Sequence, residues 1–277
     1  MSTDLSLPER TELLAIALEI ARDAGRFVES GWRKRMRVES KSVETDLVTE
    51  FDRESEARIR EALHARTRFT VVGEERGADA GSRGAAAWYV DPIDGNTNFV
   101  HGHPFYCVSI GLVAHPDEGA PTPVLGVVVA PSLHTEWTGL VDVGAWRSGE
   151  PCRVSEVARF TDALLATGFP YDRTQPDNNF DAFVQIKKRC QAVRRCGSAA
   201  IDLCLVADGT YDGYWERKLR PWDVAAGSAI VQAAGGVLSA FDGGPADVLA
   251  GEVVASNGPI HGSLVDELRG VPSAARR

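Results

Sequence analysis

Two carboxylates stand three residues apart where an apolar run ends in this sequence. The run that closes at Val90 is followed by DPIDG, from Asp91 to Gly95. Pro92 lacks a backbone N–H and so ends a strand ladder, and glycine allows a tight reversal of the chain. A turn of this composition can aim both carboxylates and the Ile93 carbonyl at one point. Taken alone, an acidic turn between a strand and a helix is the simpler interpretation.

Further acidic residues lie beside backbone breakers at the ends of apolar runs. Glu74 follows a short apolar run and a glycine, and Asp223 follows a Pro-Trp pair and opens a helical pattern. Asp46 and Asp52 lie on a segment upstream. Carboxylates at strand ends can converge at one edge of a sheet, where a low dielectric makes them repel one another strongly. We therefore expect this group to need protons or cations.

The chemical types of the candidate ligand atoms indicate which cation the site would bind. All the candidate ligands are oxygens, and no His/Cys set accompanies them, which suits Mg²⁺ or Mn²⁺ rather than zinc. Magnesium held by carboxylates serves the hydrolysis of phosphate esters. A helix beginning after Gly95 would turn its free N–H groups toward an anion. For His101 and His103, loop packing or a hydrogen bond is favoured over metal ligation.

Hydrophobic periodicity predicts the elements that must position these residues. Helical patterns run from Leu7 to about Arg35, with Ser6, Pro8 and Glu9 as start signals, and from about Leu47 to His64. Short β-like runs follow at Phe69–Val72, Ala87–Val90, Cys107–Val113, Val124–Ala130 and Glu136–Val141. Later strands are expected at Ala163–Thr167, Ala192–Arg195, Tyr211–Glu216, Gly236–Ala240 and Val253–Ala255. Helices are expected between them at Asn179–Lys188, Ala199–Ala207, Trp222–Ala234 and Gly262–Leu268, and this alternation indicates a layered α/β arrangement.

Composition narrows the class of protein. The chain has 277 residues, 44% of them hydrophobic, and a net charge of −9, which suits one compact domain and argues against nucleic-acid binding. No stretch approaches the roughly 20 apolar residues that span a membrane, and no signal peptide is expected. Five cysteines without CxxC spacing predict reduced thiols in a cytoplasmic protein. The loop Arg147–Pro151 is the expected seam between halves 1–146 and 150–277.

Several stretches together carry a family resemblance. In the first half they are Lys41-Ser42, Asp46–Asp52 (DLVTEFD), Val72–Glu75 (VGEE) and Trp88–His101. In the second half they are Cys196–Ala200 (CGSAA), Tyr214–Glu216 (YWE), Pro221–Gly227 (PWDVAAG) and Ala234–Leu238 (AGGVL). In this order and spacing the chain resembles the inositol monophosphatase family of Mg²⁺-dependent, lithium-sensitive phosphatases. The resemblance implies an α/β (α+β) fold built as an αβαβα sandwich, and a homodimer.

The resemblance also implies a metal-dependent mechanism. Glu74, Asp91 and the Ile93 carbonyl would hold one Mg²⁺, and Asp91, Asp94 and Asp223 would hold a second. A third, weaker ion would lie beside Glu74, and Mn²⁺ could substitute. Paired metals about 3.5–4 Å apart stabilise both the attacking and the leaving oxygen, so no phosphoenzyme is implied.

At Asn96 the sequence departs from the family's pattern. Asp52 matches the carboxylate that the family pairs with a threonine hydroxyl to activate water, but the usual DGTTN reads Asp94-Gly95-Asn96-Thr97-Asn98 here. A carboxamide can accept a hydrogen bond from water and donate one to Asp52 or phosphate, but it is a poor proton relay. The catalytic residues implied are Asp52, Glu74 and Asn96, and Asp52 or the metal is expected to do most of the activation. Thr97 offers a hydroxyl one position later that should point elsewhere.

The substrate contacts follow from the same resemblance. Glu216 matches the residue that accepts hydrogen bonds from ring hydroxyls, and a short glycine-led stretch matches the wall beside the sugar alcohol, although it also suits a helix cap. The full implied set is Asp94, Gly95, Asn96, Thr97, Gly197, Ser198, Ala199, Glu216 and Asp223. The basic residues Arg217, Lys218 and Arg220 form either a solvated edge or a site for a second anionic group.

The expected activity is hydrolysis of inositol monophosphate or a similar polyol phosphate, with a small-molecule phosphate ester as the binding partner. Histidinol phosphate, fructose 1,6-bisphosphate and 3′-phosphonucleotides are alternative substrates within the superfamily. An interaction protein of the same fold is the alternative from another class, which the intact acid cluster and the negative charge disfavour.

Overall fold

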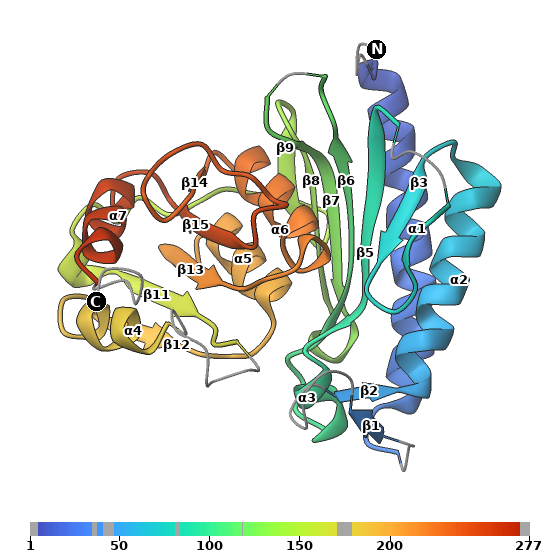
Figure 1. The fold of residues 1–277 in the computed structure, drawn as a ribbon, viewed down its shortest axis with the longest axis horizontal. Coiled ribbons are helices and arrows are strands. Elements are labelled where there is room, and N and C mark those ends of the chain that lie inside the picture. Colours follow the sequence, from blue (N-terminus) through green and yellow to red (C-terminus); the bar gives the residue numbers. More distant parts are fainter. Residues whose placement is uncertain are drawn as a thin grey trace.

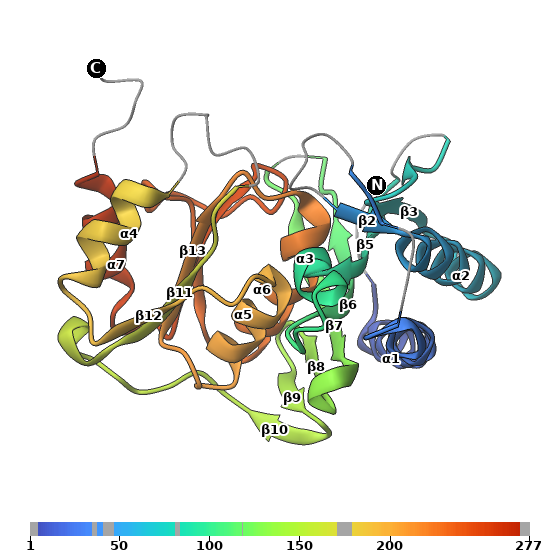
Figure 2. The same cartoon turned by 90° about the horizontal axis from the view of Figure 1, so that it is seen from below.

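The computed structural model describes residues 5–34, 38–40, 47–80, 84–117, 119–170 and 179–271. Helices and sheets alternate in five layers (Figures 1 and 2). The outer pair α1 (Leu7–Gly31) and α2 (Glu50–Arg66) covers one face of a large sheet, and α5 (Ala199–Ala207) and α6 (Pro221–Ala233) cover its other face. A smaller sheet lies beyond them, with α4 (Phe180–Lys187) and α7 (His261–Arg269) outside it. The expected αβαβα sandwich is confirmed.

The large sheet has eight strands in the order β10-β9-β8-β7-β6-β5-β3-β4. Its strands are β3 (Thr70–Gly73), β4 (Gly77–Ala78), β5 (Ala86–Asp94), β6 (Cys107–Ala114), β7 (Thr122–Ala130), β8 (Thr135–Leu140), β9 (Gly144–Arg147) and β10 (Glu150–Cys152). Pairing is antiparallel except between β3 and β5, which run parallel. The expected seam at Arg147–Pro151 is instead the β9–β10 hairpin, and the chain crosses to the second sheet after Cys152.

The smaller sheet has five strands in the order β12-β11-β13-β15-β14. They are β11 (Leu164–Thr167), β12 (Ala192–Arg194), β13 (Gly213–Arg217), β14 (Val237–Ser239) and β15 (Glu252–Ser256). A two-stranded sheet, β1 (Val38–Ser40) with β2 (Leu47–Thr49), and the short helix α3 (Asn96–Val100) lie together at one end of the large sheet (Figure 1). Short 3₁₀ turns occupy Pro131–Leu133 and Phe160–Asp162.

The helix predicted from Leu47 begins three residues later. Leu47–Thr49 form β2, and α2 starts at Glu50 because Thr49 caps it. The Thr49 hydroxyl accepts the Phe51 N–H at 3.1 Å, and the Asp52 carboxylate accepts the Thr49 N–H at 2.8 Å. A capping box of this kind satisfies amides that would otherwise lack partners at the helix start. The first helix ends at Gly31, and its predicted end at Arg35 lies outside the described residues.

A row of glycines lets α6 lie directly on the large sheet. Gly111, Gly126 and Gly139 are cross-strand partners on β6, β7 and β8. A Cβ on Gly126 would lie 2.1 Å from the Ala226 carbonyl oxygen, and one on Gly139 would lie 2.6 Å from an α6 Cα atom. The backbones therefore meet without side chains between them, and this contact sets the height of α6 and of its first residues above the sheet.

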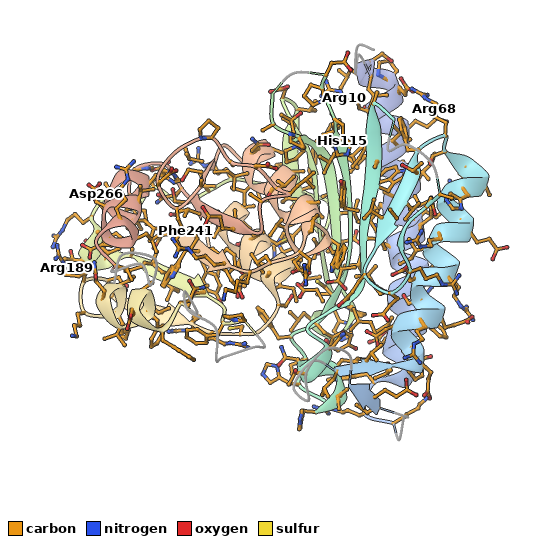
Figure 3. All side chains as sticks on the ribbon, viewed as in Figure 1. Arg10, Arg68, His115, Arg189, Phe241 and Asp266 are labelled. Atoms are coloured by element: carbon orange, nitrogen blue, oxygen red, sulfur yellow. The ribbon has the colours of Figure 1, made fainter. Side chains whose placement is uncertain are left out.

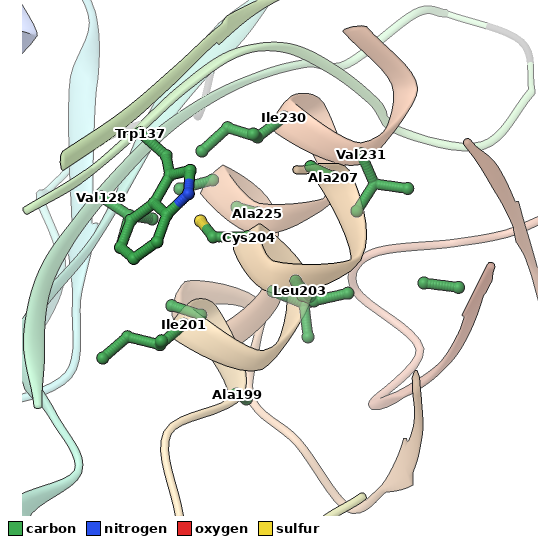
Figure 4. Close-up of a cluster of buried hydrophobic side chains, with 14 of the residues drawn as sticks. Val128, Trp137, Ala199, Ile201, Leu203, Cys204, Ala207, Ala225, Ile230 and Val231 are labelled. Atoms are coloured by element: carbon green, nitrogen blue, oxygen red, sulfur yellow. The ribbon is translucent and has the colours of Figure 1, made fainter. Parts of the chain in front are cut away.

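The core on this side is shared by both helices and the sheet. Figure 4 shows Ile201, Leu203, Cys204, Ala225, Ile230 and Val231 of α5 and α6 beside Val128 and Trp137 of the large sheet. All five cysteines lie in the described residues and none forms a disulfide. Among the helices described, none is both long enough and apolar enough to cross a membrane.

Candidate active site

The DPIDG stretch is the irregular end of β5. Asp91 pairs with Ser109 and Asp94 with Cys107, so three steps along β5 match two along β6, and the strand bulges. The Asp91 carboxylate accepts the Ile93 N–H at 3.0 Å. Gly95 then adopts a φ of +98°, and α3 begins at the next residue, as expected.

Gly95 is also required by the space around it. A Cβ there would lie 2.8 Å from the Phe105 carbonyl oxygen and 3.3 Å from the Gly197 carbonyl oxygen. The loop from the second half of the chain therefore contacts the end of β5. Asn98 fixes this contact, because its amide donates to the Phe105 carbonyl at 2.7 Å and the Cys196 carbonyl at 2.8 Å. No spacing or motif in the sequence marks Asn98 for this role.

Asp94 joins the end of β5 to the start of α5. Its carboxylate accepts the Ser198 hydroxyl at 2.6 Å and the Ala200 N–H at 2.7 Å. Burial raises the pKa of Asp94 to about 6, although these hydrogen bonds partly offset the effect. Ser198 also caps α5 through the Ile201 N–H at 3.3 Å, so the expected helix cap is confirmed. Ala199, the next residue of the implied substrate wall, is 8% exposed.

Glu74 lies at the same edge of the sheet as Asp91. β3 runs parallel to β5, Gly73 pairs with Val90, and the Glu74 N–H donates to the Val90 carbonyl at 3.3 Å. Parallel neighbours end on one side, so the two acidic residues that follow them are adjacent. The sequence predicts that carboxylates at strand ends lie close together at one edge of the sheet, and those at the ends of β3 and β5 do so.

Asp223 approaches this edge from α6. Its carboxylate accepts the Arg220 N–H at 2.7 Å in the first turn of the helix. Burial raises the pKa of Asp223 well above its ordinary value, and the charges of Asp94, Glu74 and, more weakly, Glu216 raise it further. The charges of three carboxylates from other parts of the chain thus act on Asp223.

The carboxylates do not form a ready-made cage. Among the residues that the structure describes, no three His, Cys, Asp or Glu side chains are arranged to hold a metal ion. Asp94 and Asp223 each turn an oxygen toward protein donors instead. The set fits a hard divalent cation by its oxygen donors and its mutual repulsion, because an ion can neutralise charges that otherwise raise these pKa values.

Asp52 is fully buried at the third position of α2. One of its oxygens accepts both the Thr49 N–H at 2.8 Å and the Thr49 hydroxyl at 2.7 Å. A threonine hydroxyl does meet this carboxylate, but it comes from Thr49 and not from the position that Asn96 occupies. The T-x-x-D spacing of a capping box was the signal in the sequence.

Asn96 contacts β2. Its amide donates to the Leu47 carbonyl at 2.9 Å, and its 5%-exposed side chain leaves Oδ1 buried without a hydrogen-bond partner among the described residues. The hydrogen bond that we allowed from Asn96 to Asp52 is thus made to Leu47. Thr97 is exposed. Lys41, Ser42 and Asp46 lie outside the described residues.

Replacing Asn96 with threonine tests whether this departure matters. We expect kcat to stay within about tenfold of the original, a barrier change of about 1.4 kcal/mol, because Asp52 or the metal carries most of the activation. Steady-state kinetics on one phosphate ester measures this. A thousandfold gain would show that the hydroxyl is the main activator.

Glu216 lies at the end of β13 and is 8% exposed. It accepts the Tyr214 hydroxyl, and a Cβ on Gly168 would overlap its carboxylate. Burial raises its pKa to about 7, while Tyr214 and Arg195 lower it and Asp94 raises it.

The structure shows contacts for some of the basic and histidine side chains that the sequence raised as candidates. Arg217 pairs with Glu252 at 3.4 Å, and its guanidinium lies 4.0 Å from the centre of the Phe241 ring. Phe241 is labelled in Figure 3, in the half of the molecule that holds the smaller sheet. Lys218 and Arg220 are exposed. His103 accepts the Phe105 N–H at 3.4 Å, as expected for a loop histidine.

Comparison with known proteins agrees with the geometry. The inositol monophosphatase family model matches residues 9–273. An inositol-1-monophosphatase of Synechocystis sp. is 42% identical over 94% of this chain and 89% of its own length, and a Nus factor SuhB of Pseudomonas aeruginosa is 38% identical over 88% and 91%. The solved inositol monophosphatase of Anabaena (Nostoc) sp. has a TM-score of 0.84 at 36% identity, covering 96% of this chain and 99% of that one. The chain therefore belongs to the inositol monophosphatase family.

Proposed function

We propose that this phosphatase hydrolyses inositol monophosphate or a similar polyol phosphate with Mg²⁺. The observation that supports the proposal is that Glu74, after β3, and Asp91, on β5, lie side by side, with Asp94 at the end of β5 and Asp223 in the first turn of α6, where the charges of Asp94 and Glu74 act on it. Relatives that are named inositol monophosphatases support the substrate class. Since the four residues come from both halves of the chain, we also propose that residues 1–277 act as one domain.

The four carboxylates and the Ile93 carbonyl are the proposed ligands of two or three Mg²⁺ ions, for which Mn²⁺ could substitute. Bound ions would supply an activated water and neutralise charge on the phosphate and the leaving oxygen. Asp52, whose carboxylate accepts the Thr49 hydroxyl, would accept a proton, and Asn96, whose amide donates to Leu47, would orient the water or phosphate. Gly95 and Thr97 are proposed phosphate contacts.

The other half of the site would recognise the alcohol. Glu216, which β13 presents, would accept hydrogen bonds from substrate hydroxyls, and Gly197, Ser198 and Ala199 would pack against the ring. Asn98 holds this wall against α3 through the Cys196 carbonyl. The distance between the phosphate end and the alcohol end of the site is therefore set by an interaction between the two halves.

A panel of phosphate esters with and without metal tests the proposal. We expect inositol 1-phosphate or glycerol 2-phosphate to be hydrolysed fastest, with histidinol phosphate, fructose 1,6-bisphosphate and 3′-phosphoadenosine 5′-phosphate slower. EDTA should abolish turnover, and added Mg²⁺ should restore it. Turnover that persists in EDTA would overturn the metal mechanism, and a preference for another ester would reassign the substrate.

The names of some relatives favour a second candidate, an interaction protein. The Pseudomonas aeruginosa relative is named a Nus factor and not a phosphatase. The net charge of −9 and the complete acid set favour the enzyme for this chain. Binding that survives chelation, together with no hydrolysis, would reverse this choice.

We further propose a cytoplasmic homodimer that Li⁺ inhibits. An apolar face on α4, where Phe180 and Val184 are 40% and 52% exposed, supports association. Sedimentation and a Li⁺ titration of activity test these two properties.

The pH dependence of substrate binding should report on Glu216. With its pKa raised to about 7 by burial, the side chain is a neutral acid below that pH and a stronger hydrogen-bond acceptor above it. We expect KM for a polyol phosphate to fall as pH rises through this value. Glu216→Gln cannot titrate, so its KM should lack that change, and an unaltered profile would contradict the role.

A further inference from the structure

A buried carboxylate lies beneath the turn that carries Glu74. Glu56 on α2 is fully buried, and its two oxygens accept the N–H groups of Glu75 at 2.6 Å and Arg76 at 3.0 Å. The amides that follow Glu74 are therefore both bound to one side chain from another element.

The chain before Glu74 is shaped to admit this carboxylate. A Cβ on Gly73 would lie 2.6 Å from the Glu56 carboxyl carbon, closer than real Cβ contacts come. Any larger residue at position 73 would displace either the carboxylate or the strand. Glu56 thus restrains the backbone on both sides of Glu74.

Arg60 compensates the buried charge and holds the same hairpin. Its guanidinium donates to Glu56 at 2.8 Å, to Asp79 at 2.7 Å and to the Val71 carbonyl at 3.2 Å, and it also donates to the Gly77 carbonyl. These contacts reach β3 and the strand that returns from the turn. A buried ion pair costs desolvation unless further hydrogen bonds satisfy it, and here they do.

We propose that Glu56 is a positioning residue that aims the Glu74 carboxylate into the metal site. This inference rests on the proposed function, because it takes Glu74 as a metal ligand. Glu74 follows directly after β3, and its N–H donates to the Val90 carbonyl at 3.3 Å, so the turn that Glu56 holds lies beside Asp91 on β5. Groups that orient metal ligands typically contribute about 10- to 100-fold to metal affinity or activity.

The variant Glu56→Gln isolates this role. It keeps the volume of the side chain but removes its charge and turns an N–H₂ group toward a backbone N–H or Arg60. We expect Mn²⁺ affinity, measured by titration calorimetry without substrate, to fall about 10- to 100-fold. The Mg²⁺ concentration for half-maximal activity should rise in parallel, while kcat at saturating Mg²⁺ stays within about threefold.

Glu54→Gln is the matched control. Glu54 is on the same helix and pairs with Arg58 at the same i,i+4 spacing, at 3.0 Å, but its side chain is 54% exposed. We expect its Mn²⁺ affinity to equal that of the unmodified protein. Glu56→Asp keeps the charge but shortens the reach, so it should also weaken Mn²⁺ binding and serves if the Gln variant does not fold.

The outcomes separate the two claims. If the unmodified protein binds Mn²⁺ and hydrolyses phosphate esters but folded Glu56 variants bind Mn²⁺ like Glu54→Gln, the positioning role is wrong and the proposed function stands. If the unmodified protein neither binds Mn²⁺ nor needs a divalent ion, the proposed function fails and this inference fails with it. A fall in kcat with unchanged Mn²⁺ affinity would also overturn the inference.

Discussion

We expect Asp223→Asn to lower kcat at least about 10³-fold, because it would remove one of the charges proposed to hold the metal and stabilise the transition state, an effect of about 4 kcal/mol. The amide keeps the size of the side chain, and its oxygen can still accept the Arg220 N–H that Asp223 accepts at 2.7 Å. The first turn of α6 should therefore stay intact. Activity at saturating Mg²⁺ measures the loss.

The same variant should be at least as stable as the original without metal. The pKa of Asp223 is raised by burial and by the Asp94 and Glu74 charges. When folding raises the pKa of a carboxyl group, the free energy of unfolding falls as pH rises above that group's ordinary pKa. At neutral pH the ionised Asp223 therefore destabilises the folded protein. The neutral amide removes this repulsion. Lower activity with equal or higher unfolding free energy is the signature of a residue retained for function.

Asp266→Asn is the control for Asp223→Asn. Asp266 lies on α7, its side chain is 77% exposed, and its partner Arg269 is 3.7 Å away. The same change of charge there should leave kcat unaltered. If Asp223→Asn keeps kcat within tenfold while Mg²⁺ is saturating, Asp223 is not a metal ligand.

The double replacement of Asp91 and Asp223 by alanine should abolish hydrolysis, and full activity in that protein would end the proposal.

Gly126→Ala is expected to destabilise the protein by about 3 kcal/mol, the upper range for an overpacked site. The added Cβ would lie 2.1 Å from the Ala226 carbonyl oxygen and 2.8 Å from two further backbone atoms of the same residue. Backbone cannot rotate away as a side chain can, so the whole of α6 must move from the sheet. Asp223 lies one turn earlier on that helix, and kcat should therefore fall as well.

Denaturant unfolding and steady-state kinetics measure these two effects. Gly262→Ala is the control, since a Cβ there meets nothing within 4 Å and the residue is already helical in α7. Alanine is a better helix former than glycine by about 1 kcal/mol, so this variant should gain stability slightly. Equal stability of the two variants would show that α6 does not rest on the glycine row.

Much of the fold could be predicted from local patterns. The sequence predicts the helix Ala199–Ala207 to the residue, and it places the smaller sheet's strands and five strands of the large sheet within a few residues, because periodicity and breakers act over short distances. It does not predict the short strands β4, β9 and β10. The start of α2 was misplaced because Leu47–Thr49 is apolar enough to continue a helix, and only pairing with β1 makes it a strand. The hairpin at Arg147–Pro151 was mistaken for a seam because turn residues look alike in hairpins and in linkers.

The sequence also shows which residue types could form the candidate site, but it does not show which contacts hold them in position. Several oxygen donors at the ends of apolar runs, without a His/Cys set, favour a hard metal over zinc, since donor chemistry is a property of the side chain. Glu56, in contrast, sits among exposed charges on a mostly polar helix and gives no sign of burial until β3 and its turn pack over it. The partner of Asn96 is a carbonyl 49 positions away, which no spacing rule reveals.

The sequence by itself determined the elements, the acidic donors and the family. Only the tertiary structure decided that three glycines on separate strands fall into register and admit α6 against bare backbone, bringing Asp223 to the end of β5. The physical reason is range: propensity, capping and turn chemistry act between neighbours in the chain, whereas close packing and charge repulsion act between neighbours in space.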